Sequence, residues 1–326
     1  MKIERQKIFG RKAHELSAAN IVFGVDAPFV PIMGVCMTSI LKNNPAQKFT
    51  FHVFLDAIAP PDENKLSELC KQYPALQIIL YFLPPDIYNE LYLEGDYTKA
   101  IFYRIVAADF LSQSLDKMLY MDSDMICLKP VDELINLSVE KIFVAAIADP
   151  GVVNRPIHKN KFGFSDEYLY FNSGLMCLNL DWWREEKISA QMLNIMSSRD
   201  YPFPDQDAIN LVADLNGYPV KYLPDKFNHF FRVDGVEQPL REDVVIQHFT
   251  GQLKPWHPWC ESPLKKIYES YQKISPWRDF VYQPRNYQEH RLMGRVCRRE
   301  GKWLEALKWY WSYLKRRHVE KKSQRG

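Results

Sequence analysis

Apolar residues in the first 150 positions follow two alternating periods, one typical of strands and one of helices. Short apolar runs rich in β-branched and aromatic residues predict strands, and longer stretches with one apolar face predict helices. The expected strands are residues 19–26, 49–58, 76–84 and 117–125, and the expected helices are 31–44, 60–74 and 100–114. This alternation predicts an α/β fold with a mostly parallel sheet flanked by helices on both faces.

The second half of the chain continues the pattern and then changes character. Residues 141–149 read as a strand, 168–183 as a strand pair or strand–turn around Asn-Ser-Gly, and 204–217 as a helix. A further strand begins at 244 and runs into a loop rich in Gly, Pro and Trp. After about 262 the pattern becomes helical. We therefore expect a main domain over 1–261, with halves at about 19–150 and 151–261, followed by a helical region over 262–326.

Charge is distributed unevenly along the chain, although the formal net charge is only +2. Residues 295–326 contain eleven Lys and Arg against three Asp and Glu, a charge of +8, which leaves −6 for residues 1–294. An acidic body with a basic tail favours an anionic partner that contacts the tail alone. Nothing in this distribution indicates nucleic acid.

Cysteine usage and the N-terminal residues predict a cytoplasmic protein. The six cysteines are scattered without a CxxC pair, and several lie in apolar runs, as expected of buried thiols in a reducing compartment. The first 20 residues contain no apolar segment typical of a signal peptide, and no stretch approaches the ~18 apolar residues of a membrane span. Association with a membrane surface remains compatible with this composition.

Several familiar chemical motifs are absent. The chain contains neither GxxxxGK[ST] nor GxGxxG, and it lacks HExxH, GxSxG and zinc-ligand spacing. A bound nucleotide would therefore need a metal ion, rather than a Gly-rich loop, to hold its phosphates.

Two aspartates, Asp122 and Asp124, follow the apolar run of residues 117–121. If the strand continues through them, both carboxylates point to one face, where Mg²⁺ or Mn²⁺ favours such oxygen ligands. Aspartate is equally typical of a turn after a strand. Because ligands gather at the carboxyl ends of parallel strands, this position favours a site, and Asp26 ends the first expected strand in the same way.

A second group lies in the segment QHFTGQLKPWH, residues 247–257. His248 is a potential metal ligand, Gly251 supplies flexibility and Lys254 a positive charge for phosphate. Each also has a simpler interpretation, such as a hydrogen-bonded histidine at a strand end. Likewise, Asp205 in PDQDAIN is compatible with a helix cap, and FNSG with a turn.

The complete set of segments resembles glycosyltransferase family 8, and most closely its bacterial lipopolysaccharide core glucosyl- and galactosyltransferase branch. The matching segments occur in the family's order over roughly residues 19–260, and they are NIVFGVD, IFYRIVAADFL, KMLYMDSDMIC, YFNSGLMCLNLDWW, PDQDAIN and IQHFTGQLKPWH. The resemblance implies the GT-A fold, with a nucleotide-sugar half at about 19–150 and a donor and acceptor half at about 151–261.

The resemblance also implies a metal-dependent donor site. Asp122, Asp124 and His248 would hold Mn²⁺ or Mg²⁺ against the diphosphate of UDP-glucose or UDP-galactose. Other residues would line the donor site: Gly24, Val25, Asp26, Arg104, Ser123, Asp149, Asn172, Ser173, Asp205, Gln206, Gly251 and Lys254. In the first motif some relatives carry Asn two residues after the Asp, whereas this chain has Ala27-Pro28, which removes a side-chain contact there.

The family transfers sugars with retention, and the resemblance places Gln206, Asp205 and Arg104 at the reacting centre. A double displacement requires a nucleophile on the opposite face of the sugar ring. An amide oxygen such as that of Gln206 is a weak nucleophile compared with a carboxylate. We therefore favour departure from the front face, in which the leaving phosphate accepts the acceptor's proton, over a covalent adduct on Asp205.

The basic tail would contact an anionic membrane. Trp303, Leu307, Tyr310 and Leu314 follow helical spacing, so a basic amphipathic helix is expected to lie on the cytoplasmic face of the inner membrane, near a lipopolysaccharide core acceptor. A helix packed on its own domain is the alternative. Two other functions remain open, a glycogenin-like or other polysaccharide-priming transferase and a non-catalytic nucleotide-binding protein on the membrane surface.

Overall fold

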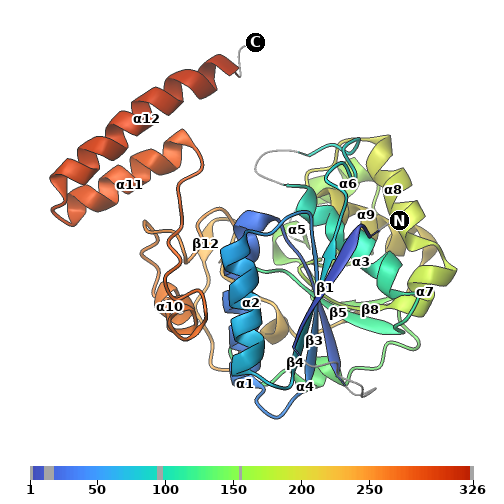
Figure 1. The fold of residues 1–326 in the computed structure, drawn as a ribbon. Helices are drawn as coiled ribbons and strands as arrows, with labels where there is room; N and C mark the ends of the chain where they lie inside the picture. The colour runs from blue at the N-terminus through green and yellow to red at the C-terminus, as the bar shows by residue number, and fades with distance from the viewer. Residues whose placement is uncertain (1–2, 11–17, 94–97, 154–155, 324–326) are drawn as a thin grey trace.

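The computed structural model describes residues 3–10, 18–93, 98–153 and 156–323, and these residues form a central eight-stranded sheet (Figure 1). Its strands, in spatial order, are β1 (Arg5–Gly10), β4 (Leu76–Phe82), β3 (Phe49–Leu55), β2 (Ala19–Gly24), β5 (Lys117–Met121), β8 (Leu175–Asn179), β7 (Val144–Ala146) and β9 (Val220–Tyr222). Strands β4, β3, β2 and β5 are mutually parallel, while β1 and β8 pair antiparallel to their neighbours. The mostly parallel α/β sheet predicted from the sequence is confirmed.

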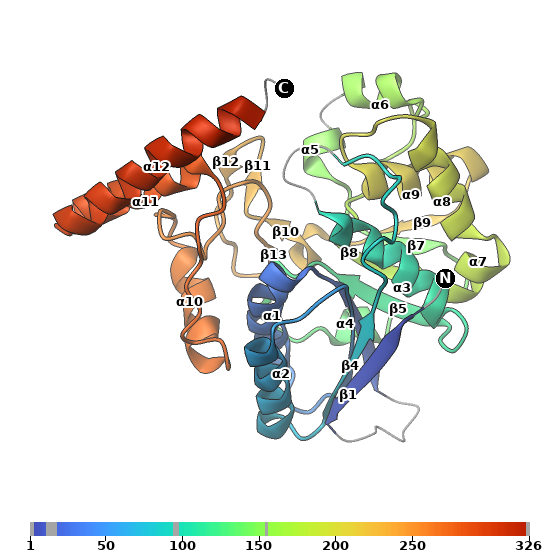
Figure 2. The same ribbon diagram turned by 45° about the horizontal axis from the view of Figure 1, so that its top comes forward.

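Helices cover both faces of this sheet (Figures 1 and 2). In β2, Ile21 and Phe23 pack into one apolar cluster and Val22 into the other, because successive side chains of a strand point to opposite faces. One face is covered by α1 (Val30–Asn43) and α2 (Pro60–Gln72). The other is covered by α3 (Tyr103–Leu111), α7 (Leu180–Glu185), α8 (Ile188–Ser198) and α9 (Pro204–Asn216). Shorter elements are η1 (Ala27–Phe29), η2 (Lys99–Phe102), η3 (Asp225–Phe227), α4 (Asp132–Ile135), α5 (Pro150–Val153) and α6 (Pro156–Phe162).

The strand expected over residues 117–125 is interrupted. Strand β5 ends at Met121, and Asp122–Asp124 form a bend before β6 (Met125–Cys127). Strand β6 leaves the large sheet and pairs with β13 (Ile246–His248), which also pairs with β10 (His229–Phe230). The expectation that the two aspartates alternate along one strand is therefore wrong, because the chain turns between two sheets at this point.

Residues 180–183, the last part of the strand pair or strand–turn expected at 168–183, also differ from the prediction. They begin α7, because the side chain of Asn179 accepts a hydrogen bond from the backbone N–H of Trp182 and caps a helix there. Strand β1 was not expected, since its residues are mostly exposed and lack strand-like apolar alternation. Strands β11 (Arg232–Val233) and β12 (Val236–Glu237) form a separate small hairpin.

The first part of the C-terminal region packs on the body. Helix α10 (Lys265–Ile274) lies against α1, and Trp277 after it is fully buried. A Cβ at Gly34 of α1 would lie 2.2 Å from the Trp277 ring, so only glycine allows this close approach. The indole N–H of Trp277 donates to Asp62 of α2 at 2.8 Å. The core that includes Ile21 therefore continues through Trp277.

Helices α11 (Tyr287–Arg299) and α12 (Trp303–Ser323) form a hairpin that projects from the body (Figures 1 and 2). Tyr310 packs against Gly294, where an added Cβ would lie 2.8 Å from the tyrosine ring. Tyr310 is therefore not on the exposed face of α12 that was expected to include it. The exposed apolar side chains of α12 are Trp303, Leu304, Leu307, Trp311 and Leu314. The predicted stripe is therefore correct at three positions, and Leu304 and Trp311 complete it.

Among the described residues, none of the helices combines the length and apolar character needed to cross a bilayer.

Candidate active site

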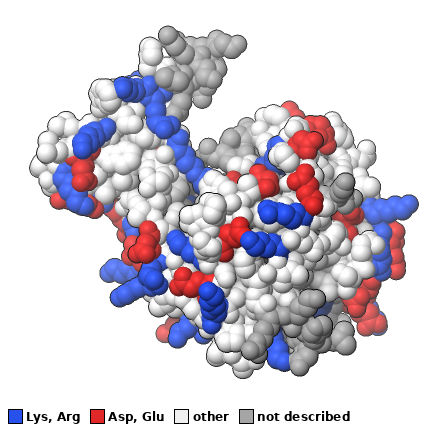
Figure 3. All heavy atoms as spheres, viewed as in Figure 1, with Lys and Arg blue, Asp and Glu red and all other residues white. Residues whose placement is uncertain are grey.

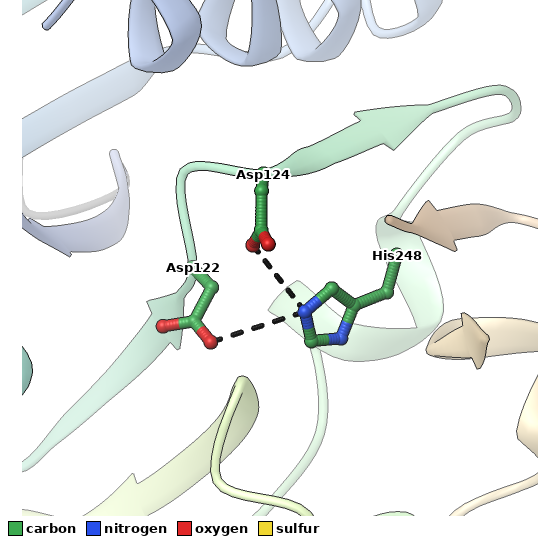
Figure 4. A group of neighbouring side chains, drawn as sticks. All are labelled: Asp122, Asp124 and His248. Atoms are coloured by element: carbon green, nitrogen blue, oxygen red, sulfur yellow. Dashed lines mark ion pairs between the residues drawn. The ribbon is translucent and has the colours of Figure 1, made fainter. Parts of the chain in front are cut away.

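Asp122, Asp124 and His248 converge where the bend after β5 meets the end of β13 (Figure 4). The Nε2 atom of His248 lies 3.3 Å from Asp124 Oδ1 and 4.0 Å from Asp122 Oδ2. One potential ligand atom from each residue lies within 4.8 Å of the others. Pairing of β6 with β13 places His248 opposite Met125, next to the bend, so the second sheet brings the histidine to the aspartates.

Each aspartate uses one oxygen for other side chains and directs the other toward His248. Asp122 Oδ1 accepts hydrogen bonds from Arg104 Nη2 at 3.0 Å and from the Tyr120 hydroxyl at 3.1 Å. Asp124 Oδ2 pairs with Lys254 Nζ at 2.7 Å. The remaining Oδ2 of Asp122 and Oδ1 of Asp124 face the imidazole. Two carboxylate oxygens and one imidazole nitrogen form a donor set that suits a divalent cation such as Mn²⁺.

Space in front of these ligands is kept open by Gly174. A Cβ at this position would lie 2.7 Å from His248 Cε1 and 2.8 Å from Asp122 Oδ2. The backbone also holds the bend in place, because the N–H of Asp122 donates to the carbonyl of Gly174 at 2.7 Å. The residues present therefore fit a bound metal ion.

A hydrogen-bond relay that starts at Asp149 fixes the tautomer of His248. A carboxylate only accepts, so Asn172 turns its Nδ2 toward Asp149 Oδ2 at 3.0 Å. Asn172 Oδ1 accepts from Asn228 Nδ2 at 2.9 Å, and Asn228 Oδ1 faces His248 Nδ1 at 2.9 Å. The proton consequently resides on Nδ1, which leaves the Nε2 lone pair directed at the aspartates, as a metal ligand requires.

Arg104 is buried and forms contacts to both sides of the site. Its Nε lies 3.0 Å from Asp205 Oδ2, its Nη2 contacts Asp122, and its Nη1 donates to the carbonyl and hydroxyl of Ser173 at 2.7 Å. The guanidinium also lies 4.5 Å from the ring centroid of Tyr120. Arg104 thus joins the bend after β5 to the start of α9, and these contacts occupy all three of its nitrogens.

Gln206 is held at both ends of its side chain. Its Oε1 accepts from the N–H of Ser173 at 2.9 Å and from Asn172 Nδ2 at 3.0 Å, and its Nε2 donates to Asp149 Oδ2 at 3.1 Å. The Ser173 hydroxyl is 3.2 Å from the same Oε1. The helix start that carries Asp205 and Gln206 is buried, and Pro204 suits its first position because the N–H that proline lacks has no partner within a helix there.

The expected nucleoside residues lie at the same sheet edge as the aspartates. Because Val22 of β2 pairs with Tyr120 of β5, Gly24 at the end of β2 lies at the same level as Asp122, the residue that follows β5. Val25 is buried, and Asp26 accepts a hydrogen bond from the N–H of Phe29 at 3.3 Å to begin η1. A Cβ at Gly24 would approach Tyr103 Cβ to 3.0 Å.

Burial and nearby positive charges shift the pKa values of the aspartates in this site in opposite directions. Burial raises the pKa of Asp122 and of Asp205, and the Arg104 guanidinium opposes both shifts. Burial also acts on Asp124, but the ammonium group of Lys254 beside it outweighs burial and holds the pKa of Asp124 well below its ordinary value. Asp124 is therefore the more firmly ionised of the two aspartates.

The remaining expected residues take the following places. Ser123 is buried within the bend, and Gly251 adopts a left-handed conformation with φ of 84° in the loop before Lys254. Sequence reasoning missed Asn228 and Gly174, which hold and make room for His248. Gly174 lies within the recognised FNSG segment, whereas Asn228 in KFNHFF carries no motif signal.

Comparisons with known proteins agree with this geometry. The model for glycosyl transferase family 8 matches residues 20–260. This chain belongs to glycosyl transferase family 8. The matched interval contains every expected donor-site residue from Gly24 to Lys254, so the family-8 assignment covers the whole constellation described above. The chain is therefore an enzyme, a glycosyltransferase.

Two curated relatives are similar over most of their length. The lipopolysaccharide 1,2-glucosyltransferase of Escherichia coli strain K12 is 30% identical over 274 residues, 80% of this chain and 79% of the relative. The lipopolysaccharide 1,3-galactosyltransferase of Salmonella typhimurium is 28% identical over 315 residues, 92% of each chain.

Solved structures confirm the fold of this family-8 member. The galactosyltransferase LgtC, solved with donor and acceptor sugar analogues, superposes with a TM-score of 0.65 at 21% identity over 82% of this chain and 99% of that one. The bifunctional glycosyltransferase WbbM gives a TM-score of 0.69 at 18% identity, over 83% of this chain and 52% of that one. The fold is GT-A, as the sequence resemblance predicted.

Proposed function

We propose that this glycosyltransferase transfers a hexose from UDP-glucose or UDP-galactose to the lipopolysaccharide core oligosaccharide, with retention and an α-glycosidic product. The observation that carries the proposal is the set of Asp122, Asp124 and His248, with the histidine held in the metal-binding tautomer. The similarity to lipopolysaccharide glucosyl- and galactosyltransferases supports the choice of donor and acceptor class.

The leaving diphosphate is stabilised by positive charge on one side of the site. Asp122, Asp124 and His248 would hold Mn²⁺ or Mg²⁺, and such an ion, when bound, neutralises charge on the departing UDP. Lys254 supplies a second positive charge next to Asp124, and the left-handed Gly251 allows its loop to turn toward the phosphates. Ser123 in the bend would contact the ribose.

The nucleoside would occupy the sheet edge beside the bend. Gly24 leaves the end of β2 free of a side chain, Val25 is buried next to it, and Asp26 offers a carboxylate to the base. Burial raises the pKa of Asp26, and a hydrogen bond with Thr98 and the charge of Arg285 oppose this shift.

The hexose would lie against Asp149, Asn172, Ser173, Asp205 and Gln206. These side chains are buried and polar and already satisfy one another, so sugar hydroxyls would join an ordered network rather than organise a loose one. Such preorganisation favours the transition state because no side chain has to reorient as the bond breaks.

The hydrogen bonds around Asp205 and Gln206 support front-face departure. Gln206 Oε1 already accepts from Ser173 and Asn172, so it is suited to supporting positive charge and poorly suited to forming a bond. Asp205 is paired with Arg104 at 3.0 Å, which weakens it as a nucleophile. Arg104 therefore positions Asp205. In this mechanism the leaving phosphate accepts the proton of the acceptor hydroxyl, and the new bond forms on the same face.

The enzyme would work on the cytoplasmic face of the inner membrane. The exposed apolar side chains Trp303, Leu307 and Trp311 of α12 lie on a helix that also carries Lys308 and Lys315. Figure 3 shows Lys and Arg side chains gathered along the hairpin, which a notch in the surface separates from the body. An apolar face with basic neighbours suits an anionic bilayer.

A donor screen on truncated lipopolysaccharide acceptors tests the proposal. We expect Mn²⁺-dependent transfer from UDP-glucose or UDP-galactose, with an α-linkage in the product by NMR. Absence of transfer from both donors, or a β-linked product, would contradict it. A glycosyl adduct on Asp205 detected by mass spectrometry would overturn the front-face mechanism while leaving the reaction class intact.

A further inference from the structure

Arg285 lies in the segment that leads into α11, beyond the end of the family match at residue 260. Its guanidinium carbon is 5.1 Å from the ring centroid of Phe29 and 5.7 Å from that of Tyr282. Phe29 ends η1, the short helix that Asp26 caps. The C-terminal region therefore delivers a cation to the element that follows the expected nucleoside carboxylate.

Aromatic contacts connect Arg285 to the loop that carries Lys254. The ring of Phe29 meets Trp256 edge-to-face at 6.2 Å, and Lys254 Nζ lies 5.9 Å from the Trp256 ring centroid. The rings of Phe29 and Trp256 thus link Arg285 to Lys254, although 30 residues separate the two cations in the chain.

Arg285 is an exposed residue, and within the described part of the chain its side chain forms no ion pair. The nearest carboxylate in sequence, Glu289, instead accepts hydrogen bonds from the Tyr282 hydroxyl and from the backbone N–H of Arg285. These bonds order the segment without neutralising the side chain. The two aromatic rings are cation–π partners of the guanidinium, and among the described residues its N–H groups donate no hydrogen bond.

Several positively charged side chains lie near His257. His257 contacts the rings of Trp259 and Tyr282 at 4.7 and 4.6 Å. Burial and the charges of Lys254, Arg285 and Lys265 together lower the pKa of His257 to about 3. Lys254 is paired with Asp124, and Lys265 is close to Glu269 at 3.9 Å, whereas Arg285 forms no ion pair among the described residues and acts on Asp26 only through its charge at longer range.

We propose that Arg285 is a second anion-binding residue of this active site, which binds a phosphate-type oxyanion of a substrate outside the metal and Lys254 clamp. The proposal rests on the proposed function and adds a contribution from the C-terminal region. A planar guanidinium forms two parallel hydrogen bonds to such an oxyanion, which a lysine ammonium does not reproduce. The oxyanion belongs either to the nucleotide donor or to a phosphorylated acceptor saccharide.

Two measurements on the full-length chain distinguish these sources. The first is the Kd of UDP with Mn²⁺ by calorimetry, and the second is the acceptor KM for truncated lipopolysaccharide before and after phosphatase treatment. The variants are Arg285→Gln and Arg285→Lys, with Arg278→Gln as the matched control, because Arg278 is an exposed arginine of the same region.

We expect Arg285→Gln to raise one of the two constants about tenfold or more, Arg285→Lys to raise the same constant less, and Arg278→Gln to leave both unchanged. A raised UDP Kd assigns the oxyanion to the donor. A raised KM that disappears with the dephosphorylated acceptor assigns it to the acceptor.

Equal constants for Arg285→Gln and Arg278→Gln in an active enzyme would overturn the inference and leave the proposed function standing. If the wild-type chain transfers no hexose, the proposed function fails instead. The calorimetric measurement requires no turnover. In that case a raised Kd of UDP in Arg285→Gln supports the inference, and an unchanged Kd overturns it. Unfolding temperatures of the variants verify that each one is folded.

Discussion

Asp122 and Asp124 differ in their surroundings although one residue separates them. Asp122 shares an oxygen with Arg104 and Tyr120, whereas Asp124 is paired with Lys254. Each keeps one oxygen directed at His248. This division explains why Arg104, Tyr120 and Lys254 do not block a metal ion. They orient the carboxylates and leave the facing oxygens available.

The relay from Asp149 to His248 leads to a prediction at Asn228. Asn228→Ala removes the acceptor for His248 Nδ1–H, so the imidazole loses both its orientation and its fixed tautomer. We expect Mn²⁺ affinity, measured by calorimetry in the presence of UDP, to fall about 10- to 100-fold.

Asn216→Ala is the control for this variant, because Asn216 ends α9 and contacts Gln191 and Val212, away from the metal ligands. Unchanged Mn²⁺ affinity in Asn228→Ala would show that the relay does not govern the histidine.

The sequence predicted which residues lie together where a recognisable motif contains them. Asp122, Asp124 and His248 were predicted together, and the structure brings them together. Asn228 was not found because its role depends on contacts to Asn172 and His248, 56 and 20 residues away, that no local pattern encodes. The predicted roles of the sugar- and nucleoside-facing residues stay predictions.

At the scale of elements, the bend between β5 and β6 matters most. The apolar run and the Asp-x-Asp motif look like one strand, because a bend at Asp122–Asp124 has no Gly or Pro to announce it. The bend sends β6 to a second sheet with β13, and only this pairing delivers His248 to the site. Strand and helix existence was predictable from periodicity. Membership of a second sheet was not, because pairing depends on residues about 120 positions apart.

The boundary expected after residue 261 falls within a continuous core. Leu264, Tyr268, Trp277 and Tyr282 belong to the same buried cluster as Ile21. We propose that the body and the chain to about residue 282 fold as one unit, with the hairpin as the separable part.

Trp277→Ala tests this proposal, because it empties the slot over Gly34 and removes the bond to Asp62. We expect the free energy of unfolding to fall by about 3–5 kcal/mol in urea titrations followed by fluorescence. Trp311→Ala is the matched control, since this side chain is 61% exposed, and its effect should stay within about 0.5 kcal/mol. Equal stability of the two variants would show that Trp277 does not join the segment to the body.

At the scale of the whole molecule, the two sides of the α11–α12 hairpin differ in their surroundings. Its inner side packs α12 on α11 through Gly294 and Tyr310, and its outer side exposes five large apolar residues. Replacing Leu304, Leu307 and Trp311 together by Gln removes apolar surface without touching the packed side or the positive charge. We expect binding to anionic liposomes, measured by sedimentation, to weaken about tenfold or more.

Leu215→Gln is the control for this variant, because Leu215 is 69% exposed on α9 of the body. Unchanged sedimentation of the triple variant would exclude the apolar face of α12 as the membrane contact. Transfer to a soluble acceptor should be the same in both variants, since the hairpin substitutions lie outside the site.

The central claim is that Asp122 and Asp124 hold the metal ion on which hexose transfer depends. The most direct measurement is the Mn²⁺-dependent rate of hexose transfer from the UDP-sugar in Asp122→Ala and Asp124→Ala, with the exposed Asp132→Ala as control. We expect each site variant to lose at least about a thousandfold in rate while remaining folded, and the control to match the wild type. Rates within about tenfold of the wild type in both site variants would contradict the account.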